Sequence, residues 1–132
     1  MKLNSFKLIQ YSLVIIFIWF GVLKILGVSP VGDLVKGTYP IFPEPLFMTV
    51  LGIGEVLIGL LLISTKTIKL GIILMWLQLG GIFFGVVLSP TFYFQNMNLL
   101  FLSANGEFVV KNLVLLAGSY FLFEQSSKSK AK

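Results

Sequence analysis

Long apolar runs alternate with short polar segments along the whole chain. The runs cover approximately residues 8–28, 47–64, 68–89 and 106–123. A helix that crosses a bilayer needs about 20 mainly apolar residues, because each residue adds only about 1.5 Å along the helix axis. The pattern therefore predicts an all-α, polytopic membrane protein, a bundle of four transmembrane helices formed by one domain over residues 1–132.

Composition supports this interpretation, because 57% of the residues are hydrophobic, only 11% are charged and the mean hydropathy is +0.98. A soluble domain carries about 25% charged residues. The first run exceeds the apolar region of about 7–15 residues in a secretory signal, and no A-x-A-like cleavage site follows it. We therefore interpret residues 8–28 as the first membrane helix.

Most lysines lie in three segments that must face the same side of the bilayer: the N-terminus, the link between the second and third runs, and the C-terminal tail. These residues are Lys2, Lys7, Lys66, Lys69, Lys128, Lys130 and Lys132. Because cytoplasmic segments of membrane proteins are enriched in lysine and arginine, we expect both termini in the cytoplasm of a bacterial inner membrane. Topology then explains the net charge of +5, and no nucleic-acid partner is predicted.

The two segments on the outer side differ in composition. Between Ser29 and Gly37, residues suited to helix caps predict a short surface helix after the first span, and the prolines that follow predict an extended path. The second segment, residues 90–105, is rich in aromatic side chains. These side chains favour an aromatic belt at the membrane interface, with a lid over the bundle as the alternative.

Glu55 lies in the middle of an apolar run, in the stretch "VLGIGEVLIGLLLIS". A charged side chain at the centre of a membrane helix costs about 3 kcal/mol, so Glu55 should face the bundle interior and be either partnered or protonated. Gly52 and Gly59 share its face of the helix, and small residues there let a neighbouring backbone approach closely.

The third run carries a similar stripe, with Gly71, Gln78 and Gly85 at heptad spacing and Gly81 beside them. We therefore expect the second and third helices to meet along their glycines, which would bring Gln78 toward Glu55. Taken alone, the glycines indicate a packing surface and nothing more.

Lys24 and Lys111 are candidate partners for Glu55. At about 1.5 Å per residue, both lysines lie roughly 6–8 Å below the outer surface, and Glu55 lies roughly 12 Å below it. Lys24 could therefore reach Glu55, or could instead extend to water along its own helix. For Lys111, Glu107 at i−4 offers an ion pair within the same helix, so its place beside Glu55 stays open.

Three stretches carry a family resemblance: "WFGVLK" (residues 19–24), "GEVLIG" (54–59) and "GEFVVKNLVLLAG" (106–118). They are similar to motifs of the DoxX-like membrane proteins, and most of all to the subgroup that includes a bacterial reactive-chlorine-resistance membrane protein. The resemblance implies a four-helix bundle. Its motif positions in this chain are Lys24, Glu55, Lys111 and Asn112.

The resemblance implies little about activity. Proteins of this superfamily include the small subunit of a thiosulfate:quinone oxidoreductase, membrane partners of redox enzymes and a receptor-assembly chaperone. A shared fold does not select among these functions. At most, it implies that this chain is the membrane subunit of an oxidoreductase and does not catalyse a reaction alone.

The chain contains no cysteine and no histidine. Thiol chemistry, iron–sulfur ligation, haem ligation by imidazole and ordinary zinc sites are therefore not available to these residues. The five carboxylates are spread too widely to predict a metal site. Accordingly, we predict neither a catalytic residue nor a metal ligand.

Three functions remain open. The first is an accessory membrane protein of redox or oxidative-stress physiology, which binds a quinone-like or other small polar-headed molecule in an outer-half pocket. The second is a small proton-coupled transporter that uses Glu55 as its carrier carboxylate, and the third is a non-catalytic assembly or chaperone-like protein.

We favour the first function, with a redox partner protein or a second copy of the chain as partners besides the lipid bilayer. The ionisable and amide groups would bind the polar head, and the aromatic groups would line the pocket. The predicted binding residues are Trp19, Phe20, Lys24, Glu55, Gln78, Lys111 and Asn112.

Overall fold

The computed structural model describes residues 4–28, 46–98 and 100–130. The short surface helix expected between residues 29 and 37, and the proline-containing path after it, lie outside the described residues.

The described chain is helical, apart from turns and one antiparallel bridge between Phe94 and Leu102. Its elements in chain order are α1 (Ser5–Ile25), α3 (Leu46–Ile63), α4 (Ile68–Leu88), the short 3-10 helices η1 (Pro90–Phe92) and η2 (Gln95–Met97), α5 (Ala104–Val110) and α6 (Asn112–Lys130).

Three helices, α1, α3 and α4, are long and apolar enough to cross a membrane. They confirm three of the four predicted spans, with ends that differ from the prediction by at most a few residues. Only 28–33% of the most apolar stretch of each helix is buried inside the protein, so the remaining apolar surface needs a nonaqueous surrounding. The structure therefore indicates a membrane protein.

The fourth predicted span, residues 106–123, is not one continuous helix. A turn at Lys111 separates α5 from α6, and α6 continues to Lys130 through the charged residues Glu124 and Lys128. By length and composition, α6 is therefore not among the described helices that could cross a membrane. Apolar periodicity predicted helix in this region correctly, but it did not predict the break or the polar final turns.

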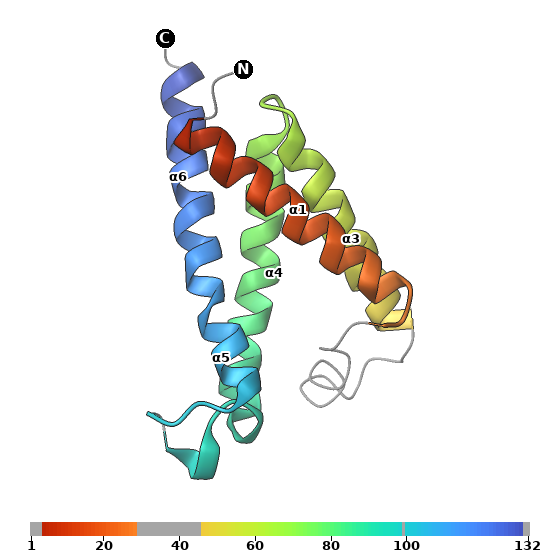
Figure 1. Cartoon of the computed structure of the whole chain (residues 1–132), viewed down its shortest axis with the longest axis vertical. Helices are drawn as coiled ribbons and strands as arrows, with labels where there is room; N and C mark the ends of the chain where they lie inside the picture. Colours follow the sequence, from red (N-terminus) through yellow and green to blue (C-terminus); the bar gives the residue numbers. More distant parts are fainter. Residues whose placement is uncertain (1–3, 29–45, 99, 131–132) are drawn as a thin grey trace.

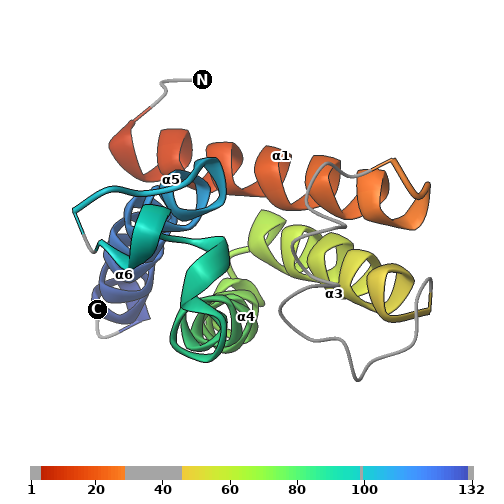
Figure 2. The same cartoon turned by 90° about the horizontal axis from the view of Figure 1, so that it is seen from below.

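The long helices form a closed ring of contacts, in which α1 contacts α3 and α6, and α4 contacts the same two helices. Figure 1 shows that both ends of the described chain and the α3–α4 turn lie at one end of the molecule, and Figure 2 shows α4 between α3 and α6. Four lysines lie at that same end: Lys7 in the first turn of α1, Lys66 in the α3–α4 turn, Lys69 in the first turn of α4 and Lys128 in the last turn of α6. Most of the buried residues form an apolar core, which includes Leu13, Phe17, Ile58, Leu62, Ile72, Met75, Leu79 and Leu122.

Glycines allow α1 and α3 to pack at very short range. A Cβ added to Gly21 would lie 2.6 Å from the carbonyl oxygen of Gly52, and a Cβ added to Gly52 would lie equally close to that of Gly21. A Cβ added to Gly59 would lie 2.5 Å from the side-chain Cγ1 of Ile18 of α1 and 3.2 Å from its backbone nitrogen. The two antiparallel helices therefore approach backbone to backbone.

The predicted pairing of the glycine stripes of α3 and α4 is confirmed for the α4 side at Gly71 and is wrong for the α3 side. The α3 stripe faces α1, and of the α4 glycines Gly71 packs against Leu61 and Leu62 of α3, whereas a Cβ at Gly81 would meet no atom within 4 Å. The prediction assumed that neighbours in sequence share their small-residue faces. The rotation of α3 instead points this face toward α1.

The aromatic segment of residues 90–105 is partly buried and partly exposed. Tyr93 is buried, with 3% of its surface exposed, and its carbonyl oxygen lies against Gly106 of α5, as a lid would place it. Phe101 is 61% exposed. Backbone hydrogen bonds from Ser103 to Tyr93 (2.9 Å) and from Gln95 to Phe101 (2.7 Å) hold the segment together.

Substituting Gly52 should separate α1 from α3. In Gly52→Ala the new Cβ would lie 2.6 Å from a carbonyl oxygen, so we expect the free energy of unfolding to fall by about 1–3 kcal/mol. The matched control is Gly54→Ala in the same helix, where a Cβ meets no atom within 4 Å and helix propensity improves by up to about 1 kcal/mol. Thermal unfolding in detergent measures both; equal shifts for the two variants would contradict the close contact.

Candidate functional site

A buried ion pair links α1 and α3 beside the glycine contact. Lys24 lies one turn after Gly21 on α1, and Glu55 lies one turn after Gly52 on α3, so each side chain shares the face of its glycine. Lys24 Nζ donates to Glu55 Oε2 at 2.8 Å, and the two residues are only 7% and 6% exposed. The predicted contact between Lys24 and Glu55 is confirmed, and Lys24 does not extend to water.

Gln78 of α4 completes a cluster of three side chains. Its Nε2 donates to Glu55 Oε1 at 2.5 Å, so each carboxylate oxygen accepts a hydrogen bond from a different helix. The expectation that Gln78 lies near Glu55 is confirmed. We call Lys24, Glu55 and Gln78 the polar cluster.

The Gln78 amide has one group without a partner. Its Oε1 has almost no solvent-accessible surface and accepts no hydrogen bond in the described part of the chain. A buried carbonyl oxygen without a donor costs about 1–3 kcal/mol, and such atoms in native proteins call for an explanation. The polar cluster therefore has unused acceptor capacity.

The polar cluster is neutral as a whole, because the Lys24 ammonium balances the Glu55 carboxylate. These two are the buried charged residues of the described chain. Among the described residues, no group of three histidine, cysteine, aspartate or glutamate side chains could hold a metal ion. The arrangement can donate and accept hydrogen bonds, but it offers no excess charge to an ion.

The remaining predicted site residues do not join the polar cluster. Trp19 is 62% exposed and Phe20 is 40% exposed. At about 100° per residue, Trp19 lies about 140° around α1 from Lys24, whereas Phe20, four residues before Lys24, is on the same side of the helix but stays exposed. Lys111 is exposed at the α5–α6 turn, whereas Asn112 is buried at the first position of α6.

The ion pair expected between Glu107 and Lys111 is not formed either. The recorded contact between these residues is a backbone hydrogen bond from Lys111 N–H to the Glu107 carbonyl, at 3.1 Å. Among the described side chains, the i,i+4 ion pair instead joins Glu124 and Lys128 at 3.4 Å on the surface of α6.

Two polar contacts were not expected from the sequence. Gln10, 3% exposed, donates from Nε2 to the carbonyls of Leu62 (2.7 Å) and Ile63 (3.1 Å), which have no partner within the last turn of α3. Trp76 Nε1 donates to Ser119 Oγ at 2.8 Å and so joins α4 to α6. A glutamine inside the first apolar run was the available signal. Both contacts connect helices and do not belong to the polar cluster.

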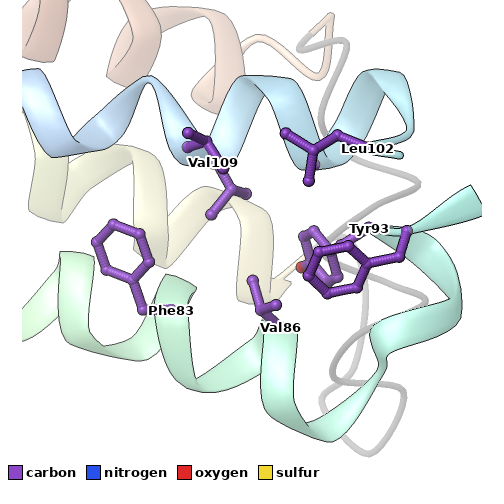
Figure 3. Close-up of a pocket in the computed structure, with 8 residues that line it drawn as sticks. Phe83, Val86, Tyr93, Leu102 and Val109 are labelled. Atoms are coloured by element: carbon purple, nitrogen blue, oxygen red, sulfur yellow. The ribbon is translucent and has the colours of Figure 1, made fainter. Parts of the chain in front are cut away.

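A second candidate is an apolar pocket of about 150 Å³ on the α5 side of α4. Figure 3 shows Phe83 and Val86 of α4 opposite Val109 of α5, with Tyr93 and Leu102 at one side. No charged side chain lines it. Ligand sites combine an apolar lining with a few convergent polar groups; the polar cluster supplies three polar side chains, whereas among the described residues that line this pocket Tyr93 alone has a side chain with a polar group.

Comparison of the chain with known protein families, with curated proteins and with solved structures finds no match. The resemblance to DoxX-like proteins therefore stays a prediction.

Removing one partner of the buried ion pair should leave the other charge uncompensated. We expect Lys24→Met and Glu55→Gln each to lower the free energy of unfolding by about 3 kcal/mol or more, and the double variant to recover part of the loss. Thermal or denaturant unfolding in detergent gives the coupling energy.

The control for this cycle is the same pair of substitutions on the surface, Lys128→Met and Glu124→Gln. Those side chains are 64% and 48% exposed, so their coupling should be at most about 0.5 kcal/mol. Additive losses at Lys24 and Glu55 would mean that the two residues act independently.

Proposed function

We propose that this chain is an integral membrane accessory protein whose polar cluster binds the uncharged polar head of a small membrane-soluble molecule of quinone type. Its physiological role would lie in redox metabolism or oxidative stress. The protein would bind the molecule for a redox partner protein and would not itself catalyse a reaction.

The observation that carries the proposal is the neutrality of a buried, hydrogen-bonding cluster between three apolar helices. An ionisable residue inside a membrane helix is costly and so indicates a functional site by default. Close packing of α1 on α3 is already provided by Gly21 and Gly52, so helix pairing does not require the charges. A neutral cluster suits an uncharged head with oxygen atoms better than it suits an anion or a cation.

The alternatives have less support. Many secondary transporters bind their substrates at interrupted helices, whereas α1, α3 and α4, which carry the polar cluster, are each continuous over their described lengths. A pure assembly protein would not need a buried ion pair with unused acceptor capacity at Gln78. The resemblance to DoxX-like proteins adds weight to a redox role and to a fourth span formed by α5 and α6.

We further propose that both termini are cytoplasmic. The support is that Lys7, Lys66, Lys69 and Lys128 belong to one end of the bundle, where the first residues of α1, the last residues of α6 and the α3–α4 turn also lie (Figure 1). Positive charge at short loops and helix ends marks the cytoplasmic side.

This orientation predicts a labelling pattern. Leu100 is 88% exposed at the opposite end from the exposed Lys66, and the chain has no native cysteine to interfere. A membrane-impermeant maleimide should label Leu100→Cys in intact spheroplasts and should label Lys66→Cys only after permeabilisation. The reverse pattern would overturn the orientation.

Ligand binding is tested with purified protein and decylubiquinone as the probe, alongside mass spectrometry of quinones that copurify with the parent. The double variant Lys24→Met/Glu55→Gln removes both charges together, and we expect its affinity for the probe to fall about tenfold or more, because hydrogen bonds to charged groups are worth about 1.5–3 kcal/mol. The surface double variant Glu124→Gln/Lys128→Met should bind as the parent does. Equal binding by all three proteins would show that the polar cluster does not bind the probe, and would contradict the proposed function.

A further inference from the structure

We propose that the polar cluster binds the reduced, hydroxyl-bearing form of its ligand in preference to the oxidised, carbonyl form. This inference rests on the proposed function, and it concerns binding alone, with no electron transfer by this chain. It follows from the orientation of one amide, that of Gln78.

The orientation of the amide is dictated by Glu55. Glu55 is the acceptor in both of its contacts, from Lys24 Nζ at 2.8 Å and from Gln78 Nε2, and a carboxylate ion paired with an ammonium has acceptor groups only. The group that faces Glu55 Oε1 at 2.5 Å must therefore be the Gln78 NH₂, as the structure has it. Turning the amide over would place two acceptor oxygens against each other.

The same orientation leaves Gln78 Oε1 on the side away from Glu55. This oxygen is buried and has no donor among the described residues. An incoming O–H group can donate to it and so satisfy it, whereas a carbonyl oxygen cannot, because it has no hydrogen. A ligand carbonyl placed there would add a second acceptor to one that is already unsatisfied.

The Lys24 ammonium does not cancel this preference. It carries three N–H donors, of which one is directed to Glu55 Oε2, so it could donate to a carbonyl or to a hydroxyl oxygen. A hydroxyl group can donate to Gln78 Oε1 whether or not it also accepts from Lys24, but a carbonyl group can only accept. The hydroxyl form therefore satisfies more of the polar cluster.

Two described side chains, one from α1 and one from α4, contact the Glu55 carboxylate. Lys24 of α1 is the cation in contact with it, and the contact from α4 is the uncharged Gln78. Among the described residues, no second buried carboxylate or cation is present to reverse the polarity of the amide.

The test compares two redox forms of one probe on the full chain in detergent. Decylubiquinol, kept reduced under anaerobic conditions, should bind about tenfold more tightly than decylubiquinone, a difference of ~1.4 kcal/mol. Equilibrium dialysis with mass spectrometric detection gives both dissociation constants. The dimethyl ether of decylubiquinol, which has the reduced ring but no hydroxyl donor, should bind no more tightly than the quinone.

The matched variant is Gln78→Met, which keeps a long unbranched side chain and removes the acceptor. We expect its preference for the quinol to shrink to within about twofold. Because both constants are measured on one preparation, their ratio does not depend on the fraction of the variant that is folded.

The outcomes separate this inference from the proposed function. Equal affinities, tighter binding of the quinone, or tight binding of the dimethyl ether would overturn the inference and leave quinone-type binding in place. A quinol preference that persists in Gln78→Met would also overturn it. Binding of neither form by the parent would overturn the proposed function, and the inference with it.

Discussion

The contact between Gly21 of α1 and Gly52 of α3 is the constraint on which the rest of the structure depends. With no side chain at either position, each backbone lies where the other's Cβ would be, 2.6 Å from a carbonyl oxygen. Lys24 and Glu55 lie one turn from this contact, in opposite directions along the two antiparallel helices, and the long Lys24 side chain spans the distance to Glu55 in the buried interface. The buried ion pair therefore lies across the same close helix contact.

In a membrane environment every buried polar group must find its hydrogen-bond partner within the protein, because lipid offers none. In the described helices, polar side chains of one helix form hydrogen bonds with groups of another helix. Gln10 of α1 donates to a carbonyl at the end of α3, Trp76 of α4 donates to Ser119 of α6, and Gln78 of α4 donates to Glu55. These contacts fix the rotation of each helix about its own axis, which apolar packing against lipid-like surfaces specifies only weakly.

The acceptor oxygen of Gln78 is the exception to this pattern, and it lies in the most polar part of the interior. Structural contacts such as that between Trp76 and Ser119 are satisfied, whereas the cluster around Glu55 is satisfied on the carboxylate side and unsatisfied on the amide side. Among the described residues, this oxygen is the buried side-chain atom without a hydrogen-bond partner, and the proposal of a binding site rests on that exception.

The sequence by itself determined the class of the protein and the positions of α1, α3 and α4, because the length of an apolar run is a local property. It also predicted that Lys24 could reach Glu55, since depth along a helix follows from the rise per residue. Only the tertiary structure decided which helix each face meets. The rotation that turns Gly52 toward α1 and Trp19 away from the polar cluster depends on packing among residues far apart in the chain. For the same reason, the link from Gln10 to α3 and the break of the fourth predicted span at Lys111 could not be derived from the apolar pattern.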